Sequence, residues 1–300
     1  MTTEVGFIGL GNMGRPMATN VLKAGFPLTV HDVVKEAAQP LLEMGARWAD
    51  TPKQVAQASR VVITSLPGPA EVEQVVLGKE GILAGARQGD LFIDMSTNRP
   101  ATISRIAQIA KERGVEVLDA PVTGGVRGAR RAALNILVGG DKATFERAKE
   151  VLAAMGSHLY HVGPVGTGNV AKLVNNIMAL SNTLIAMEAM VLGVKGGLDP
   201  KQLFDIVDAG TGTSQVFKGV FPFVIFKGRF DPPSFRIDLA VKDLQLAMAC
   251  GEELSAPLPL SRAALEAYQR AAARGLGSKD VAAAITLLEE SAGVTVRVAE

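Results

Sequence analysis

The chain has 300 residues, of which 48% are hydrophobic and 20% are charged, and this composition excludes an intrinsically disordered protein. Its 31 basic side chains nearly balance its 30 acidic ones, so the net charge of +1 is too small to recruit a nucleic acid or an anionic membrane. The single cysteine, Cys250, excludes an internal disulfide and is typical of a reducing compartment. A chain of this length exceeds what one hydrophobic core usually holds, so we expect two domains.

Short apolar runs alternate with helical patterns in the first half of the chain. This alternation predicts an α/β fold, with a doubly wound, mostly parallel Rossmann sheet that has helices on both faces. We expect this dinucleotide-binding domain to cover residues 1–163, with a helix at 142–154. The predicted strands are Val5–Gly9, Leu28–Asp32, Val61–Leu66, Leu91–Asp94, Val115–Asp119, Leu134–Val138 and His158–Val162.

Helical patterns dominate after Gly163. We expect one long interdomain helix within residues 164–195, reading from Gly166 to Val194, and then an all-α domain for substrate binding and oligomerisation at 196–300. Asp199 followed by Pro200 is a typical helix start. Further helices are predicted at 214–227, 238–252, 258–273 and 278–291.

The segment Ile177–Val194 is apolar enough to approach a membrane span, but Ser181, Asn182 and Glu188 within it favour a helix buried between domains. The apolar faces of the predicted helix 166–194 exceed what one small domain covers, which predicts a homodimer or homotetramer. Strand-like sequence begins by Val5, which leaves no room for a secretory signal. We therefore expect a cytoplasmic protein without a membrane partner.

A glycine loop follows the first predicted strand and precedes a helical pattern. In Gly9-Leu10-Gly11-Asn12-Met13-Gly14, the first glycine allows the tight turn and the second lets a pyrophosphate approach the backbone. The third permits close packing of helix on strand. The phosphates would lie at the helix N-terminus, where free amides and the dipole favour negative charge.

Asp32 ends the second predicted strand, where a carboxylate can bind the adenine-ribose diol. It would repel a 2′-phosphate, and Val33 and Val34 supply no guanidinium to bind one. NAD is therefore the expected cofactor, with NADP as the alternative because Lys35 is nearby. A simple helix cap is the other interpretation of Asp32.

Three more segments follow strand ends, where ligands bind in open α/β sheets. Leu66-Pro67-Gly68 is either a turn across which a cofactor lies or an ordinary Pro-Gly turn. Thr97 either contacts the nicotinamide ribose or belongs to a helix start before Pro100. Thr123-Gly124-Gly125 is either a nest of amides suited to a carboxylate or a flexible glycine loop.

Lys172 and Asn176 lie four residues apart on the long predicted helix, so both project from one face. A lysine near the domain junction, with an amide one turn away, suits proton transfer to or from a substrate hydroxyl. Taken alone, the pattern favours a solvated surface lysine at position 172.

Together with Lys242-Asp243-Leu244-Gln245-Leu246-Ala247, these segments resemble in order and spacing the β-hydroxyacid dehydrogenase family, whose members include 3-hydroxyisobutyrate dehydrogenase and tartronate semialdehyde reductase. The likeness covers nearly the whole chain. It implies an NAD(P)-dependent oxidoreductase that interconverts a 3-hydroxy acid and its semialdehyde, most similar to 3-hydroxyisobutyrate dehydrogenase. Tartronate semialdehyde reductase and 2-(hydroxymethyl)glutarate dehydrogenase are the alternative activities.

The resemblance also implies a role for each site residue. Lys172 matches the catalytic lysine and Asn176 its amide partner. Thr123, Gly124 and Gly125 match the substrate-carboxylate site, and Phe235 matches an aromatic near the nicotinamide. The implied cofactor contacts are Gly9, Leu10, Gly11, Asn12, Met13, Gly14, Asp32, Leu66, Pro67, Thr97 and Lys242.

Two positions depart from the family pattern. Thr123 replaces the usual serine, which keeps the hydroxyl and adds a methyl group. Ala132-Ala133-Leu134 replaces the usual Gly-Thr-Leu, which puts the local turn in question. Arg127, Arg130 and Arg131 beside it form either a solvated basic edge or a site for a second acidic group.

Other functional classes are disfavoured. A non-catalytic nucleotide-binding module would lack Lys172, and an imine or ketone reductase would have an acid or tyrosine there. The helical domain of 6-phosphogluconate dehydrogenases is much longer than the one available here. His31, His158 and His161 lack metal-ligand spacing, so we expect no metal.

Overall fold

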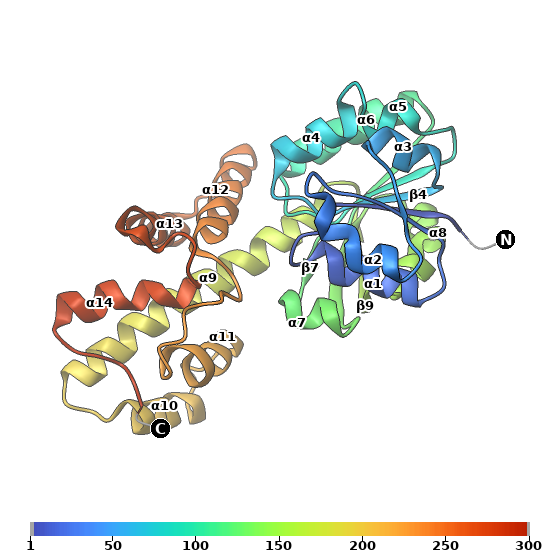
Figure 1. Ribbon diagram of the computed structural model, residues 1–300. Helices are drawn as coiled ribbons and strands as arrows, with labels where there is room; N and C mark the ends of the chain where they lie inside the picture. The colour runs from blue at the N-terminus through green and yellow to red at the C-terminus, as the bar shows by residue number, and fades with distance from the viewer. Residues whose placement is uncertain (1–2, 299–300) are drawn as a thin grey trace. The chain divides into compact units, whose positions relative to one another are not determined.

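The computed structural model describes residues 3–298, which form two compact units that divide between Lys172 and Leu173. The first unit is an α/β layer structure and the second is helical (Figure 1). A Rossmann-like parallel sheet, a long helix and a helical C-terminal region were predicted from the sequence, and all three are confirmed.

The first unit is built on one sheet with the strand order β3-β2-β1-β4-β5-β6-β8-β7, and β9 pairs with β8. Strands β1 to β6 are parallel, β8 is antiparallel to β6 and β7, and β9 is parallel to β8. Strands β3 and β7 were not predicted because each has only two residues, too few to show an alternating pattern. The strands are β1 Val5–Ile8, β2 Leu28–His31, β3 Arg47–Trp48, β4 Val61–Thr64, β5 Leu91–Asp94, β6 Glu116–Asp119, β7 Val122–Thr123, β8 Leu134–Gly139 and β9 Gly156–Gly163.

Helices cover both faces of this sheet, as the alternating sequence pattern predicts. Consecutive residues of a strand pack into two different cores, one on each face of the sheet. Ile63 packs on one face and Val62 on the other. One face carries α1 Gly14–Lys23, α2 Gln39–Glu43, α7 Gly125–Arg130 and α8 Lys142–Ala153. The other carries α3 Pro52–Gln57, α4 Pro69–Leu77, α5 Ile82–Gly85 and α6 Pro100–Glu112, and a 3-10 turn at Lys35–Ala38 precedes α2.

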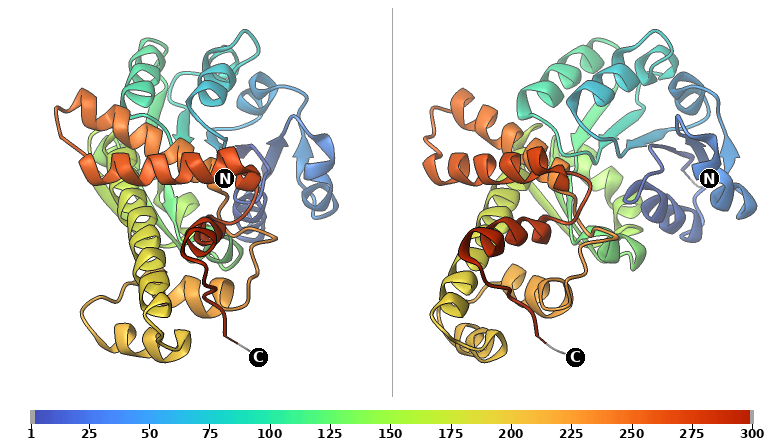
Figure 2. Two further views of the ribbon diagram at one scale, coloured as in Figure 1. Left: turned by 90° about the vertical axis from the view of Figure 1, so that its left-hand side faces the viewer. Right: turned by 60° about the vertical axis from the view of Figure 1, so that its left-hand side comes forward.

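Helix α9, Thr167–Lys195, is continuous and leads from the first unit into the second. In the second unit α12 and α13 pack side by side (Figure 2). Asp199 caps α10 by accepting a hydrogen bond from the Gln202 amide at 2.8 Å, as predicted. The other elements are α10 Pro200–Ala209, α11 Gln215–Val220, a π turn Phe221–Ile225, α12 Ile237–Glu253, α13 Pro259–Ala271, a π turn Ala272–Leu276, a 3-10 turn Val281–Ala284 and α14 Ile285–Ala292.

The core of the helical unit is aromatic at its centre. Phe204 stacks on Phe217 with ring centroids 4.8 Å apart, and Phe226 meets Phe204 edge-on at 5.6 Å. Tyr268 is fully buried and donates its hydroxyl to the carbonyl of Leu180 at 3.2 Å. That bond satisfies the one polar group that this side chain brings into the core.

By length and composition, α9 is the one helix within residues 3–298 that could cross a membrane. The core helix of a soluble protein passes the same test, so this is weak evidence of a span. Leu180, Met187 and Met190 of α9 are buried in the core of the helical unit. Those contacts account for the apolar character of one side of the helix.

The turn after α7 forms although Ala132 stands where the family usually has glycine. The amide of Ala133 donates to the carbonyl of Gly128 at 3.0 Å, a Schellman closure of the helix. The residue between them that must be left-handed is Ala132, with φ of 53°. The turn is therefore kept, but an alanine occupies a conformation that costs about 1 kcal/mol for a residue with a Cβ.

Ala132→Gly should relieve this strain. We expect the free energy of unfolding to rise by about 0.5 to 1 kcal/mol, because glycine adopts φ near 53° without a steric cost. Urea unfolding followed by circular dichroism measures the change. Ala133→Gly is the matched control and should destabilise the protein, so a gain from the control alone would contradict this explanation.

Candidate functional site

The candidate site lies at the carboxyl ends of the parallel strands. The strand order places β2 on one side of β1 and β4 on the other, so the chain reverses direction across the sheet at β1 and β4. Ligands in open α/β sheets bind outside such a switch point. The glycine loop follows β1 and Leu66-Pro67 follows β4, so both predicted cofactor segments flank it.

The three loop glycines have different surroundings. Gly9 has φ of 93°, and a Cβ there would collide with the carbonyl of Ser65. A Cβ on Gly14 would collide with the carbonyl of Gly9, whereas a Cβ on Gly11 would meet nothing within 4 Å. The first and third glycines are thus required by packing, while the second borders open space that suits an approaching pyrophosphate. Among residues 3–298 no side chain caps the N-terminus of α1.

This difference separates stability from binding. Gly11→Ala should fold with unchanged stability but bind the dinucleotide at least about tenfold more weakly, because the methyl group takes the space of the phosphates. Gly14→Ala should lose about 1 to 3 kcal/mol of stability through overpacking. Thermal unfolding and fluorescence titration with NADH test the pair, and a Gly11→Ala variant with unchanged affinity would refute the assignment of the loop.

The Asp32 carboxylate is held against the glycine loop. Its Oδ2 accepts the amide of Leu10 at 2.6 Å and its Oδ1 accepts the amide of Val34 at 2.8 Å. Each oxygen keeps a lone pair with which to accept a ribose hydroxyl. Next to it, Val33 is 95% exposed, and Lys35 places its ammonium 5.4 Å from the centre of the Trp48 ring.

The ends of β4 and β5 are joined by buried polar groups. Asp94 accepts hydrogen bonds from the hydroxyl of Thr64 at 2.9 Å, the amide of Ser96 at 3.1 Å and the side-chain amide of Asn98 at 3.1 Å. The hydroxyl of Ser96 in turn accepts the amide of Leu66 at 2.9 Å. Burial raises the pKa of Asp94, against the effect of these hydrogen bonds.

Thr97 lies between buried Ser96 and Asn98 and is half-buried. Helix α6 begins at Pro100 and its N-cap is Arg99, so Thr97 does not cap this helix. The helix-start interpretation of Thr97 is therefore weakened, and its side chain remains a candidate cofactor contact at the end of β5.

The predicted carboxylate loop follows β7. Gly124 and Gly125 have φ of 117° and 61°, values that favour glycine at both positions. The hydroxyl of Thr123 accepts the side-chain amide of Asn135 at 3.2 Å. Because its oxygen accepts this bond, the Thr123 hydroxyl hydrogen is not used by Asn135. Asn135 was not singled out from the sequence, where it is only the second residue of an apolar strand.

A second buried carboxylate, Asp119, joins β6 to the start of α9. Its Oδ1 accepts the amide of Gly166 at 2.7 Å, and its Oδ2 accepts the backbone amide of Asn169 at 2.7 Å and its side-chain amide at 3.1 Å. Burial raises the pKa of Asp119 to about 6, although the amides of Gly166 and Asn169 oppose the shift. The carboxylate is therefore mainly ionised at pH 7 and above.

Lys172 and Asn176 lie one turn apart on α9; Lys172 is half-buried and Asn176 is buried. Asn176 donates its side-chain amide to Oδ2 of Asp243 at 2.6 Å. The ammonium of Lys242 lies 3.0 Å from Oδ1 of the same carboxylate. Asp243 thus connects two residues to which the family resemblance gives roles. Phe235 packs partly buried against the core of the helical unit.

Asp243 belongs to the motif that begins at Lys242 and Asp119 ends a predicted strand, but neither was predicted as a site residue. Asp243 is 3% exposed and Asp119 is fully buried. A buried carboxylate needs a hydrogen-bonding or charged partner, yet a sequence gives no burial for one residue. Their positions directly after Lys242 and at the end of a strand were the available signals.

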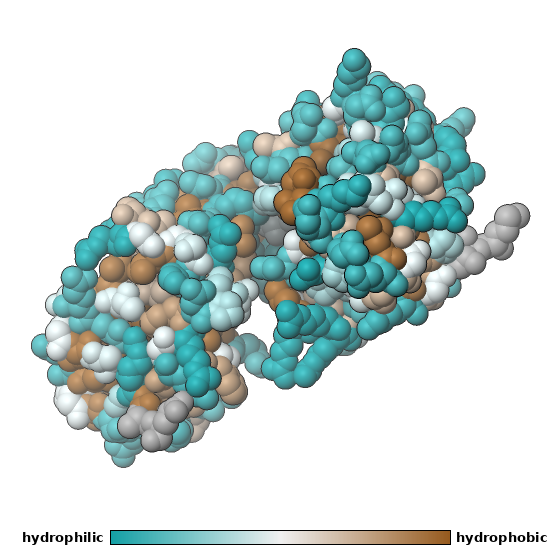
Figure 3. All heavy atoms as spheres, viewed as in Figure 1, coloured by the Kyte–Doolittle hydropathy of each residue, from teal (hydrophilic) through white to brown (hydrophobic). Residues whose placement is uncertain are grey.

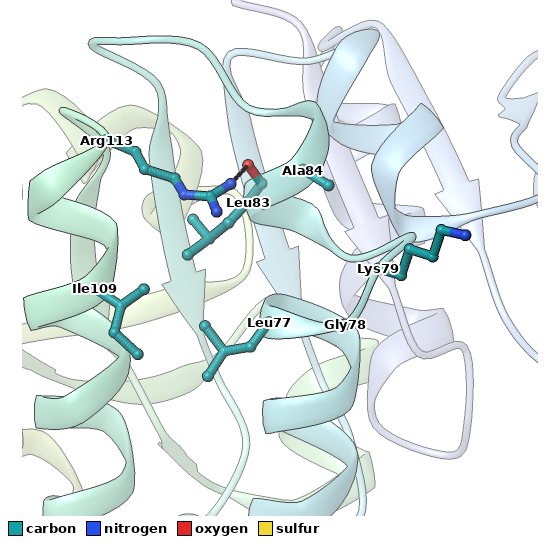
Figure 4. Close-up of a pocket in the computed structure, with 7 residues that line it drawn as sticks. All are labelled: Leu77, Gly78, Lys79, Leu83, Ala84, Ile109 and Arg113. Carbon is teal, nitrogen blue, oxygen red and sulfur yellow. Dashed lines mark hydrogen bonds between the residues drawn. The ribbon is translucent and has the colours of Figure 1, made fainter.

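A surface pocket lies elsewhere on the α/β unit. It has a volume of about 390 Å³ and is lined by the C-terminal ends of α4 and α6 and by α5, among them Leu77, Leu83 and Arg113 (Figure 4). These helices run antiparallel to the strands, so their C-termini lie at the opposite edge from the predicted site. The Arg113 guanidinium donates to the carbonyl of Leu83 at 2.8 Å and thereby stabilises the pocket wall. Within residues 3–298 no three His, Cys, Asp or Glu side chains gather as metal ligands.

Comparison with known proteins identifies the family. Residues 4–163 match the NAD binding domain of 6-phosphogluconate dehydrogenase, and residues 166–288 match the NAD-binding domain of NADP-dependent 3-hydroxyisobutyrate dehydrogenase. The chain is 38% identical over 293 residues to 2-(hydroxymethyl)glutarate dehydrogenase from Eubacterium barkeri, covering 98% of this chain and 97% of the relative. It is 40% identical over 264 residues to 3-hydroxyisobutyrate dehydrogenase from Pseudomonas aeruginosa, covering 86% and 88%.

A solved structure agrees with these relatives. That of Mycobacterium tuberculosis 3-hydroxyisobutyrate dehydrogenase with L-serine superposes with a TM-score of 0.89 at 34% identity, covering 96% of this chain and 99% of that one. The predicted family and an NAD(P)-dependent oxidoreductase are thereby confirmed. The chain belongs to the β-hydroxyacid dehydrogenase family, whose members are NAD(P)-dependent oxidoreductases of hydroxy acids.

Proposed function

We propose that this enzyme oxidises a 3-hydroxy acid to its semialdehyde, with 3-hydroxyisobutyrate as the first candidate substrate. The observation that carries the proposal is the start of α9, which brings Lys172 within two turns of a helix N-terminus fixed at the carboxyl end of β6. A lysine so placed in a dinucleotide-binding unit can exchange a proton with a substrate hydroxyl. The 3-hydroxyisobutyrate dehydrogenases among the relatives support this choice of substrate.

The substrate carboxylate would bind at Thr123, Gly124 and Gly125. Asn135 supports this role, because its donation to the Thr123 oxygen leaves the hydroxyl hydrogen available to a carboxylate. Two consecutive glycines with positive φ can turn backbone amides toward the same anion.

Lys172 would take the hydroxyl proton when the acid is oxidised and return it when the semialdehyde is reduced. In the oxidative direction the amine must therefore be neutral before the reaction. Asn176 would hold the substrate hydroxyl beside it, and Asp243 would fix the orientation of the Asn176 amide. The dinucleotide, when bound, supplies the hydride acceptor at its nicotinamide ring.

NAD is the proposed cofactor, with NADP as the alternative. The Asp32 carboxylate supports NAD because its free lone pairs suit a ribose diol and its charge repels a 2′-phosphate. Exposed Val33 offers no cation at the adjoining position. The cofactor residues Gly9 to Gly14, Asp32, Leu66, Pro67, Thr97 and Lys242 form part of this proposal.

An activity screen tests the function. Purified enzyme is assayed with 3-hydroxyisobutyrate, glycerate, 2-(hydroxymethyl)glutarate and the corresponding aldehydes, with NAD and NADP in separate reactions. Lys172→Ala should lower turnover by about 10²- to 10⁴-fold, the usual contribution of a general base, while NADH affinity stays within about threefold. Near-normal turnover in that variant would exclude Lys172 from catalysis, and no activity with any hydroxy acid would exclude the function.

A dicarboxylate is the second candidate substrate. The name of the Eubacterium barkeri relative gives one, and Arg127 and Arg130 are exposed on α7 next to Gly124 and Gly125. A guanidinium there could bind a second carboxylate. Preference for 2-(hydroxymethyl)glutarate in the screen would select this candidate over 3-hydroxyisobutyrate.

The enzyme is also proposed to work in the cytoplasm as a homodimer or homotetramer. Hydrophobic side chains are exposed among hydrophilic ones on the helical unit (Figure 3). On α9, Val174, Met178, Ile185 and Leu192 are 56 to 74% exposed, and their spacing of four and seven residues places them along one side of the helix. We propose that a second copy of the chain packs against this side of α9.

Sedimentation velocity at micromolar concentration should give a dimer or a tetramer. Leu192→Asp should shift the protein toward the monomer without unfolding it, because this side chain is 74% exposed. The control Lys201→Ala, on an exposed lysine of α10, should leave the assembly intact. A wild-type monomer would contradict the proposed assembly.

A further inference from the structure

We propose that Asp119 and Asn169 are positioning residues, which hold the first turn of α9 against the ends of β5 and β6 and so set where Lys172 projects. This inference rests on the proposed function of Lys172. It adds two residues to the site that act through another residue and need not touch the substrate.

Asp119 acts as a helix cap supplied from a distant part of the chain. The amides of Gly166 and Asn169 lie at the N-terminus of α9, where intrahelical acceptors are missing, and Asp119 accepts both at 2.7 Å. A side chain usually caps its own helix, whereas Asp119 lies 47 and 50 residues earlier in the sequence. The bond therefore ties the helix start to β6.

Asn169 provides a second anchor. Its side chain donates to Asp119 at 3.1 Å and accepts the backbone amide of Asn98 at 2.7 Å, so one amide group spans from β6 to the loop after β5. Both Asn98 and Asn169 are fully buried. The Asn98 side chain continues the network to Asp94, which holds the segment that carries Thr97.

Two glycines let the helix start approach the sheet. A Cβ on Gly168 would collide with the carbonyl of Leu137 in β8 and lie 2.9 Å from Oδ2 of Asp119. A Cβ on Gly139 would collide with Oδ1 of Asp119. The Asp119 carboxylate thus occupies space that a Cβ at Gly139 or Gly168 would take. The start of α9 therefore has little freedom to shift.

The consequence for Lys172 follows from its distance along the helix. It is three residues after Asn169, so the position of its Cα is set once the first turn is fixed. Displacing a catalytic group by about 1 Å can cost about 10²-fold in rate. At the other end of this network, Asp94 and Ser96 hold the segments that carry Leu66 and Thr97 without using Asn169.

Asn169→Ala tests the proposal. It removes the bond to the Asn98 amide and the side-chain bond to Asp119 but keeps the backbone bond. We expect kcat to fall by about 10- to 100-fold, with KM for the hydroxy acid and NADH affinity within about threefold of wild type. Activity is normalised to NADH-binding sites so that unfolded protein does not count.

Asn169→Asp is the second variant, for the case in which the alanine variant fails to fold. Aspartate is isosteric with asparagine and keeps the acceptor for the Asn98 amide. It sets a second carboxylate against Asp119, so a loss of kcat of similar size is expected. Asp90→Asn is the matched control. Asp90 is also a buried carboxylate, and it accepts Arg60 at 2.8 Å and the Arg87 amide at 2.7 Å, but it precedes β5 at the other edge of the sheet. It should lower stability and leave kcat unchanged.

The outcomes separate this inference from the proposed function. If wild-type enzyme is active, Lys172→Ala is not, and both Asn169 variants keep wild-type kcat, the positioning role is overturned and the function stands. If the Asn169 variants and Asp90→Asn lose kcat in proportion to their loss of thermal stability, the role of Asn169 is only structural and the inference is also overturned. No dehydrogenase activity in the wild type overturns both.

Discussion

The Asp119 carboxylate lies where β6 ends and α9 begins, and the geometry of the candidate site depends on that contact. Three amide groups at the start of α9 converge on its two oxygens. A buried charge is costly unless donors surround it, so the carboxylate and the helix start stabilise each other. Without this bond, the amides of Gly166 and Asn169 would lack their acceptor, and the turn of α9 that precedes Lys172 would lose its anchor to β6.

The rest of the α/β unit places ligand-binding segments at the same edge of the sheet. The strand order reverses at β1 and β4, and ligands in open α/β sheets bind outside the carboxyl ends of the strands at such a point. Gly9 and Gly14 fit the packing of the loop there, and Gly11 leaves room beside it. Because Asp94 and Asp119 end neighbouring strands, the buried polar network that connects them follows from the same parallel register.

Sequence alone predicted much of this, for physical reasons that differ between elements. Strands such as Leu91–Asp94 were found because a short apolar run bounded by polar residues favours a buried strand, whereas β7, with Val122 and Thr123 only, gives no period. The glycine loop was predicted because the spacing of Gly9, Gly11 and Gly14 between a strand and a helix is typical of dinucleotide-binding loops. The roles of Asp119, Asn135, Asn169 and Asp243 depend on partners at least 12 residues away, and no local pattern reveals such pairs. The departure at Ala132 was noticed, but its left-handed conformation was not predicted because alanine rarely adopts it.

The central claim is that Lys172 transfers the proton of the substrate hydroxyl, and chemical rescue tests it most directly. Lys172→Ala enzyme is saturated with cofactor and hydroxy acid, and small primary amines such as methylamine are added over a range of concentrations. We expect turnover to return in a saturable manner and to increase with the fraction of amine in the neutral form. Turnover that is near normal without added amine, or that no amine of any size increases in a correctly folded variant, would contradict it.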